Sequence, residues 1–201
     1  MIVKVCGITT IEDARLSVEA GADALGFNFY PKSPRYIRPE DARPIADAIP
    51  VRVLRVGVFV NESAEHIAEV ARIADLDVVQ VHGTGSAPDG LRLWRAKNAG
   101  PDFDPAEVEQ DWEAEAFVLD SPAPGTYGGT GVPFDWSRIP ALTRPVMLAG
   151  GLDGSNVADA IRIAKPWGVD ACSRLERSPG VKDPAKVAAF VRAAKREAEG
   201  L

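Results

Sequence analysis

The sequence predicts a single (β/α)8 barrel, a TIM barrel, over residues 1–201. Short apolar runs typical of buried strands occur eight times, and helical periodicity appears between most of them. Near-continuous apolar strands that alternate with helices indicate a parallel sheet covered by helices. A chain of 201 residues suits one domain and lies at the short end of the range for this fold. Eight units favour closure into a barrel, and the Gly-x-Gly-x-x-Gly fingerprint of the open dinucleotide-binding sheet is missing after the first strand.

The predicted elements follow one another regularly. The strands cover Ile2–Cys6, Ala24–Phe29, Leu54–Phe59, Val78–Val81, Leu91–Ala96, Ala116–Asp120, Val146–Ala149 and Val169–Cys172. The helices cover Ile11–Ala20, Pro39–Ala48, Ser63–Ala74, Gly154–Ala164 and Asp183–Glu197, and several begin at residues suited to N-capping. Only Thr84–Gly90 separates the fourth and fifth strands, whereas a crossover usually needs about a dozen residues. The fourth helical unit is therefore predicted to be a single turn or absent.

Composition and charge exclude several classes of protein. The formal net charge is −6, and the Lys and Arg residues are scattered, which is not the pattern of a protein that binds nucleic acid or an anionic membrane. No apolar run approaches the roughly 18 residues of a membrane span, and the N-terminus runs directly into a strand without a signal-peptide pattern. The two cysteines form neither a disulfide framework nor a Cys/His metal cluster. We expect a cytoplasmic protein without metal.

The last two predicted strands each run straight into small polar residues. Val146–Leu152 ends in Ala-Gly-Gly-Leu, and Val169–Glu176 continues through Cys172 and Ser173. Backbone N–H groups at a helix start, with the positive end of the helix dipole, bind phosphate without any lysine or arginine. In barrels such a site lies after strands 7 and 8. The sequence therefore predicts a small phosphorylated ligand.

Two residues at strand ends are candidates for proton transfer, because catalytic groups of this fold come from the C-terminal ends of the strands. Cys6 ends the first strand, and its thiolate could act as a base or nucleophile, although a free cysteine is more often a small buried apolar residue. Asp120 ends the sixth strand and could exchange a proton, although Asp beside Ser and Pro more often orders a loop. The glycine-rich loop after Asp120 favours a lid over a site.

Three charged residues add to this pattern. Asp170 lies within the last strand, where a buried carboxylate needs a partner. Lys4, two residues before Cys6 and so on the same strand face, is the candidate, in a pair that is either structural or part of a site. Arg35 follows the second strand on a loop with two prolines and suits carboxylate recognition, although a lone loop arginine is more often solvated.

Eight motifs spread from end to end of the chain resemble the phosphoribosylanthranilate isomerase family. They are Lys4–Thr9, Ala24–Phe29, Ser33–Ile37, Val56–Asn61, Val79–Gly83, Gly128–Gly131, Ala149–Leu152 and Ser178–Asp183. The resemblance implies a barrel of the ribulose-phosphate-binding type that carries out an Amadori rearrangement in tryptophan biosynthesis without metal or cofactor. The substrate would be N-(5-phosphoribosyl)anthranilate and the product 1-(2-carboxyphenylamino)-1-deoxyribulose 5-phosphate. We expect a monomer or a homodimer.

The resemblance also implies roles for the candidate residues. Asp120 matches the general acid that protonates the ribose ring oxygen, and Cys6 matches the base that removes the C2′ proton. Arg35 matches the residue that binds the anthranilate carboxylate, and Asp170 matches a carboxylate that orients the site. The residues expected to bind or cover the phosphate are Gly150, Gly151, Cys172, Ser173 and Arg174, with Gly128 and Gly129 in the covering loop.

Arg174 departs from the family pattern, because it stands where the family usually has a glycine. If that position needs a positive φ, an arginine is strained there; alternatively its guanidinium contacts the phosphate. We favour displaced backbone geometry, which predicts a lower affinity for phosphate. Cys172 and Cys6 end neighbouring strands of a closed barrel, so a disulfide between them is a further hypothesis, which requires Cα atoms within about 7 Å.

Two alternatives remain open. One is the related Amadori isomerase of histidine biosynthesis, which acts on a bulkier substrate with two phosphates. That family has a carboxylate where this chain has Cys6, and this chain has no glycine-rich second phosphate site after Val56–Asn61. The other is a barrel that binds phosphosugars without catalysis. Arg174 and the short fourth unit favour it, and the presence of both Cys6 and Asp120 opposes it.

Overall fold

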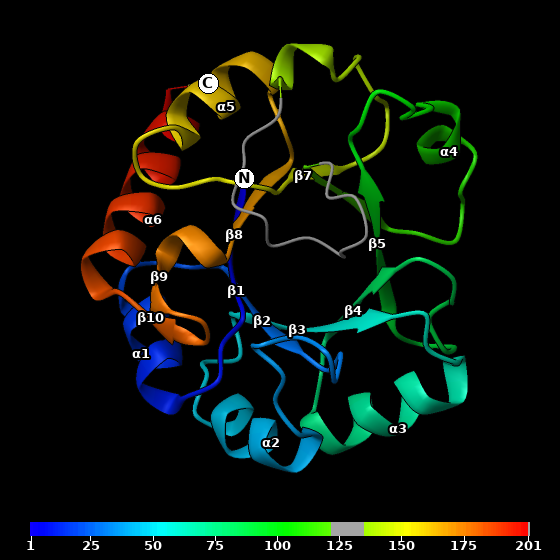
Figure 1. Cartoon of the computed structure of the whole chain (residues 1–201), viewed down its shortest axis with the longest axis vertical. Coiled ribbons are helices and arrows are strands. Elements are labelled where there is room, and N and C mark those ends of the chain that lie inside the picture. Colours follow the sequence, from blue (N-terminus) through cyan, green and yellow to red (C-terminus); the bar gives the residue numbers. More distant parts are fainter. Residues whose placement is uncertain (122–134, 201) are drawn as a thin grey trace.

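The computed structural model describes residues 1–121 and 135–200. Eight parallel strands form a closed barrel at its centre, with helices around it (Figure 1). The strands are β1 Ile2–Cys6, β2 Ala24–Asn28, β3 Leu54–Val60, β4 Val78–His82, β5 Arg92–Asn98, β6 Ala116–Asp120, β7 Val146–Leu148 and β8 Gly168–Ala171. They lie in chain order around the barrel, and β8 pairs with β1 to close it. The predicted (β/α)8 barrel is confirmed.

Helices follow most of the strands. They are α1 Ile11–Glu19, α2 Pro39–Asp47, α3 Ala64–Ala74, α4 Ala106–Glu109, α5 Val157–Ala164 and α6 Pro184–Glu199, with 3-10 turns η1 Trp136–Arg138 and η2 Ser173–Leu175. The side chains of Thr10, Ser63 and Asp183 accept backbone hydrogen bonds from the first turns of α1, α3 and α6. These caps satisfy N–H groups that have no partner within the helix, which explains why the predicted starts of these three helices agree with the structure to within one residue.

The fourth helical unit is absent, in agreement with the prediction. Residues 83–91 join β4 to β5 without a helix, and Figure 1 shows the ring of helices interrupted between α3 and α4. Besides the two 3-10 turns, two features were not predicted. One is α4, a single turn between β5 and β6, and the other is an antiparallel hairpin of β9 Glu176–Ser178 and β10 Val181–Lys182 that precedes α6.

The strand side chains divide between two cores, because successive residues of a strand point to opposite faces. The larger core lies between the barrel and its helices and includes Val3, Val5, Leu25, Phe27 and Phe190. The smaller core fills the barrel interior with Ala24, Val56, Val78, Trp94, Ala116, Val118 and Met147. Toward the carboxyl ends of the strands some interior positions are polar. Lys4 and Cys6 follow the interior residue Ile2 by two and four positions, and Asp120 follows Val118 and Ala116 by two and four, so all three share the interior face. On β1 and β6, these polar groups therefore lie toward the carboxyl ends of the strands.

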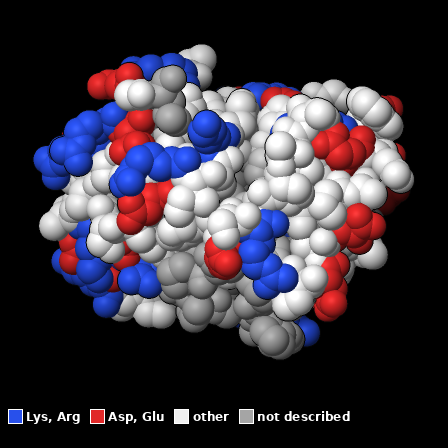
Figure 2. Space-filling model, turned by 90° about the horizontal axis from the view of Figure 1, so that it is seen from above, with Lys and Arg blue, Asp and Glu red and all other residues white. Residues whose placement is uncertain are grey.

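Charged side chains of both signs occupy the molecular surface. Figure 2 shows basic residues gathered toward one side of the visible face with acidic residues among them, and mainly acidic residues toward the other side. Within the described residues, no helix has the length and apolar character needed to cross a membrane.

Candidate active site

A pocket opens where β6, β7 and β8 end. Seven of the residues singled out from the sequence line it, which are Asp120, Gly150, Gly151, Asp170, Cys172, Ser173 and Arg174. The parallel strands bring these residues together, although they lie up to 54 positions apart in the chain, because all their carboxyl ends meet at one rim. Gly128 and Gly129 fall outside the described residues.

Asp120 ends β6 with its side chain at the pocket. Burial raises the pKa of its carboxyl group to about 6, and the nearby Asp170 carboxylate adds to the rise. The Ser121 backbone N–H donates to Asp120 Oδ1 at 2.8 Å, which opposes part of this shift by stabilising the charged form. Asp120 is therefore a carboxyl group that can carry a proton near neutral pH, as a general acid requires.

Asp170 and Lys4 form the buried ion pair that the sequence suggested. They are paired across β8 and β1, and Lys4 Nζ donates to Asp170 Oδ2 at 2.8 Å. Lys4 is fully buried, and burial alone would lower its pKa, but the charges of Asp170 and Cys6 outweigh burial and raise it. The other carboxylate oxygen, Oδ1, is buried without a hydrogen-bond partner among the described residues. Asp170 thus has one oxygen that Lys4 holds and one buried oxygen without a hydrogen-bond partner among the described residues.

Cys6 lies at the end of β1, where it is 7% exposed, and its partner is a second cysteine. A hydrogen bond from the Cys172 thiol lowers the pKa of Cys6 to about 7, against the effect of burial, and Lys4 adds to the lowering. The same hydrogen bond, together with burial, raises the pKa of Cys172. Cys6 is therefore the more acidic thiol of the pair, the one that more readily forms the thiolate that accepts a proton. Both cysteines are free thiols in this structure, and the disulfide stays a hypothesis.

Glycine makes room for Cys6. Gly26 pairs with Cys6 across β2 and β1, and a Cβ at Gly26 would lie 2.6 Å from Cys6 Sγ. A side chain there would displace the sulfur. The neighbouring Gly7 has φ +76°, and a Cβ on it would lie 2.7 Å from Arg35 Cδ and 2.9 Å from Cys172 Sγ. These close approaches bring Cys6, Cys172 and Arg35 into one cluster beside the pocket.

The loop after β7 exposes backbone to the pocket. Gly150 and Gly151 have positive φ angles of 82° and 64°, which favour glycine, and a Cβ on Gly150 would lie 2.7 Å from Asp120 Oδ1. Asn156 fixes this loop, since its Nδ2 donates to the Gly151 carbonyl at 2.8 Å and its Oδ1 accepts from Asp153 N at 2.9 Å. These bonds also place the start of α5 at Val157, three residues later than predicted. No motif in the sequence pointed to Asn156.

The strain expected at Arg174 is not present. Among the described residues other than glycine, only Asn61, Asp75 and Lys165 have positive φ, so the arginine carries no strain of this kind, and the lower affinity for phosphate stays a prediction. The residue lies in η2, whose helical turn needs no left-handed conformation. Its Nε donates to Asp153 Oδ2 at 2.6 Å. Arg174 therefore links the loop after β8 to the loop after β7.

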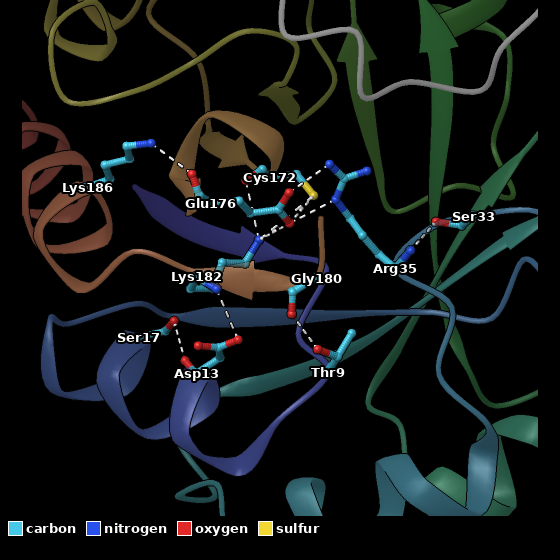
Figure 3. Close-up of polar contacts among 10 residues, drawn as sticks. All are labelled: Thr9, Asp13, Ser17, Ser33, Arg35, Cys172, Glu176, Gly180, Lys182 and Lys186. Atoms are coloured by element: carbon cyan, nitrogen blue, oxygen red, sulfur yellow. Dashed lines mark hydrogen bonds and ion pairs between the residues drawn. The ribbon is translucent and has the colours of Figure 1, made fainter. Parts of the chain in front are cut away.

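Arg35 is held by a carboxylate that sequence analysis did not find. Figure 3 shows Glu176, at the start of β9, between the side chains of Arg35 and Lys182. Arg35 donates to both oxygens of Glu176 at 2.8 and 2.7 Å, and Lys182 Nζ donates to Oε1 at 3.0 Å. Burial would raise the pKa of Glu176, but these two cations outweigh it and lower the pKa. Glu176 and Arg35 lie 141 residues apart, so spacing could not have revealed the pair.

The described residues hold no group of three or more His, Cys, Asp or Glu side chains placed to bind a metal ion. His82, at the end of β4, is nearly buried, and burial lowers its pKa to about 4, with a further contribution from the charge of Lys4. The imidazole is therefore neutral near pH 7 and contacts Gln80 through its Nε2 at 3.1 Å.

Fold and site together define a (β/α)8-barrel enzyme with groups suited to acid–base chemistry beside glycine-rich loops at the carboxyl ends of its strands. A family model described as N-(5'phosphoribosyl)anthranilate (PRA) isomerase matches residues 3–193. The chain belongs to this family of isomerases.

Individual relatives agree with the family match over nearly the whole chain. The N-(5'-phosphoribosyl)anthranilate isomerase of Solibacter usitatus is 52% identical, over 97% of this chain and 98% of its own. A crystal structure of a phosphoribosyl anthranilate isomerase in complex with reduced 1-(o-carboxyphenylamino)-1-deoxyribulose 5-phosphate is 40% identical, with a TM-score of 0.82 over 98% of this chain and 100% of its own. A structure of monomers generated from the dimeric isomerase of Thermotoga maritima has the same identity, coverage and TM-score. The resemblance found in the sequence is confirmed.

Proposed function

We propose that this chain, as one barrel domain over residues 1–201, catalyses the Amadori rearrangement of N-(5-phosphoribosyl)anthranilate to 1-(2-carboxyphenylamino)-1-deoxyribulose 5-phosphate, a step of tryptophan biosynthesis in the cytoplasm. The observation that carries the proposal is a pocket in which a protonatable carboxyl group, Asp120, adjoins the Gly150–Gly151 loop, and whose lining includes Cys172, the hydrogen-bond partner of the low-pKa Cys6. The relatives named above act on, or bind, molecules of this kind.

The reaction needs two proton transfers. Asp120, in its protonated form, donates a proton to the ribose ring oxygen as the C1′–O bond breaks, and the anthranilate nitrogen lone pair forms the C1′=N bond of a Schiff base. The Cys6 thiolate then removes the C2′ proton, and the electrons of that bond move to give an enolamine. Protonation at C1′ and loss of the enol proton produce the ketone, so the reaction consumes no water or redox equivalent. Each proton transfer can contribute about 10²–10⁴-fold.

The two ends of the substrate meet different parts of the site. The phosphate would be held by the backbone of Gly150, Gly151, Cys172 and Ser173, where the described chain uses neither the Gly150 nor the Gly151 N–H in a hydrogen bond. The anthranilate carboxylate would pair with Arg35. Asp170 would orient the site beside Cys6 through its bond to Lys4 rather than exchange protons itself. This arrangement supports a substrate with one phosphate and one carboxylate.

A fluorescence assay tests the proposed function directly. Freshly generated phosphoribosylanthranilate is fluorescent, and we expect its decay to accelerate when the purified chain is added, but not when Cys6→Ala is added. A decay no faster than the spontaneous rate, with a properly folded protein, would favour the phosphosugar-binding barrel. Turnover of the two-phosphate substrate of histidine biosynthesis instead would favour the other alternative.

Homodimer formation, as for the Thermotoga maritima isomerase, is proposed for this chain and is testable by sedimentation.

The pH dependence of kcat/KM should report the two groups. The active form requires Cys6 without its proton and Asp120 with its proton. Below the lower pKa, about 6 for Asp120, the fraction of Cys6 thiolate limits the rate, so kcat/KM rises about tenfold per pH unit. Above the pKa of Cys6, about 7, loss of the Asp120 proton limits the rate, so kcat/KM falls about tenfold per unit. We expect a maximum between these two values, and a rate still rising at pH 9 would contradict the assignment.

Arg174→Gly should weaken substrate binding, which reverses the expectation from the sequence. Arg174 adds a positive charge beside the phosphate loops and neutralises Asp153, and its backbone carries no strain that glycine would relieve. Because such partly exposed pairs contribute up to about 1 kcal/mol, we expect KM to rise by about three- to fivefold with kcat nearly unchanged. Arg162→Gly, on the exposed face of α5, serves as the control. A KM for Arg174→Gly below the wild-type value would restore the original expectation.

A further inference from the structure

The carboxylate of Glu176 occupies one particular edge of the Arg35 guanidinium. Nε donates to Oε1 at 2.8 Å and Nη2 donates to Oε2 at 2.7 Å. This is the side-on edge of the planar fork, and it uses two of the five N–H groups. Among the described residues, Nη1 donates no hydrogen bond, and Figure 3 shows it turned away from Glu176. The end-on edge, formed by Nη1 and Nη2, thus remains available for a second planar anion.

The charges around Arg35 favour such an anion. Arg35 and Lys182 are two cations that share the single carboxylate of Glu176, so these three side chains carry one net positive charge, of which the nearby Cys6 thiolate offsets a part. The Lys182 side chain is fully buried and that of Glu176 is 4% exposed, so little water screens this charge. Lys4 does not add to it, because Asp170 neutralises it. The cluster can therefore attract a ligand carboxylate even though Arg35 is already paired.

Glu176 is itself rigidly held. Lys186 Nζ donates to its backbone carbonyl at 2.8 Å, and Lys182 Nζ also donates to the Cys172 carbonyl at 3.3 Å. The Lys182 backbone N–H donates to Asp13 at 3.1 Å, which attaches β10 to α1. Arg35 is anchored at its other end, where its backbone N–H donates to Ser33 Oγ at 3.1 Å. Because both residues are anchored by these bonds, the Glu176 carboxylate can fix the plane of the Arg35 guanidinium.

We propose that Glu176 is a positioning residue, which holds Arg35 by its side-on edge so that the end-on edge receives the carboxylate on the aromatic ring of the substrate. The role rests on the proposed function and assigns to the β9–β10 hairpin the selection of substrates that carry this carboxylate. Lys182 allows the arrangement, since it keeps the Glu176 carboxylate ionised and leaves the cluster positive. The opposite role is also chemically reasonable, in which Glu176 competes with the ligand for Arg35, and the two roles predict opposite effects of removing the charge.

A pair of ligands that differ only in the carboxylate tests the proposal by calorimetry. One is reduced 1-(o-carboxyphenylamino)-1-deoxyribulose 5-phosphate, and the other is its phenylamino analogue without the carboxylate. A charge-assisted bidentate contact corresponds to about 10- to 100-fold in affinity, and we expect wild type to prefer the first ligand by this factor. In Glu176→Gln the preference should fall to within about threefold, while affinity for the phenylamino analogue is retained. That retained affinity shows that the phosphate site and the barrel are intact.

The chain offers a matched control. Arg92 donates through Nε and Nη2 to both oxygens of Glu115, which is the same side-on geometry at an exposed position. Glu115→Gln should leave the ligand preference at the wild-type value. For the reaction itself, Glu176→Gln should raise KM by about tenfold and change kcat by less than about threefold, because the contact acts on binding. A buried structural role alone would not separate the two ligands.

A second variant keeps the test valid if Glu176→Gln does not fold. Arg35→Lys keeps a cation opposite Glu176 but cannot present two planar edges, so it should lose the same preference. The double variant should show no further loss, because both changes remove one contact. An unchanged or increased preference in Glu176→Gln would overturn the positioning role, and so would a wild type that binds both ligands equally. A wild type that binds neither would overturn the proposed function as well.

Discussion

Asp120→Asn is expected to lower kcat by about 10²- to 10⁴-fold with little change in KM. Asparagine preserves the size of the side chain. It can still accept the hydrogen bond that Ser121 N donates to Asp120 at 2.8 Å in the wild-type structure. It has no acidic proton, so ring opening must rely on water. The raised pKa of Asp120, which burial and Asp170 produce, is what allows a carboxylic acid to serve as proton donor near neutral pH. Decay of substrate fluorescence under saturating conditions measures the effect.

The pH profile distinguishes loss of the acid from general damage. In Asp120→Asn the decline of kcat/KM above the pKa of Cys6 should disappear, because that decline reports the Asp120 proton. Asp104→Asn is a suitable control, since Asp104 is an exposed carboxylate that accepts a backbone hydrogen bond from Ala106 at 2.9 Å. It should retain wild-type kcat. A loss of less than about tenfold in Asp120→Asn, or a rise confined to KM, would assign ring opening to another group.

Asp170→Asn is expected to lower the free energy of unfolding by ~3–5 kcal/mol, the cost of leaving one buried charge without its partner. Lys4 is fully buried and its ammonium donates to Asp170 at 2.8 Å, so an amide in place of the carboxylate leaves the cation in the barrel interior without its ion-pair partner. Because native proteins are stable by only about 5–15 kcal/mol, this is a large fraction of the total. Urea unfolding monitored by tryptophan fluorescence gives the value.

A double variant separates the structural role of the pair from its role in the site. Adding Lys4→Met to Asp170→Asn should restore most of the lost stability, since neither charge of this pair then remains. Asp47→Asn, which breaks the exposed Arg43–Asp47 pair, should cost no more than about 0.5 kcal/mol. If the double variant is stable but turns over substrate slowly, the pair orients the site. Wild-type turnover in that variant would make the pair purely structural.

Local patterns were sufficient for the architecture and for part of the site. The apolar runs marked every barrel strand, because a strand buried on both faces is largely apolar. Cys6 and Asp120 could be selected because each ends a strand, and all parallel strands end at the same rim. The Lys4–Asp170 pair followed from strand alternation and from the cost of an unpaired buried charge. The missing fourth helix followed from the length of its connection.

Other features depend on contacts between distant segments. The Arg35–Glu176–Lys182 cluster joins the loop after β2 to a hairpin after β8, and no periodicity links residues that far apart. The absence of a positive φ at Arg174 also depends on the structure, because the turn η2 around this residue sets its backbone conformation. The pKa values of Cys6 and Asp120 depend on burial and on neighbours such as Cys172 and Asp170.

The sequence by itself determined the barrel, the rim at which its polar residues gather, and the two groups proposed to transfer protons. These are consequences of strand order and side-chain alternation, which are local properties of a chain. Only the tertiary structure decided which charge opposes which, which thiol of the cysteine pair is the more acidic, and which edge of Arg35 remains available. Electrostatic energies depend on distances and burial in three dimensions, and those are settled only when the chain has closed on itself.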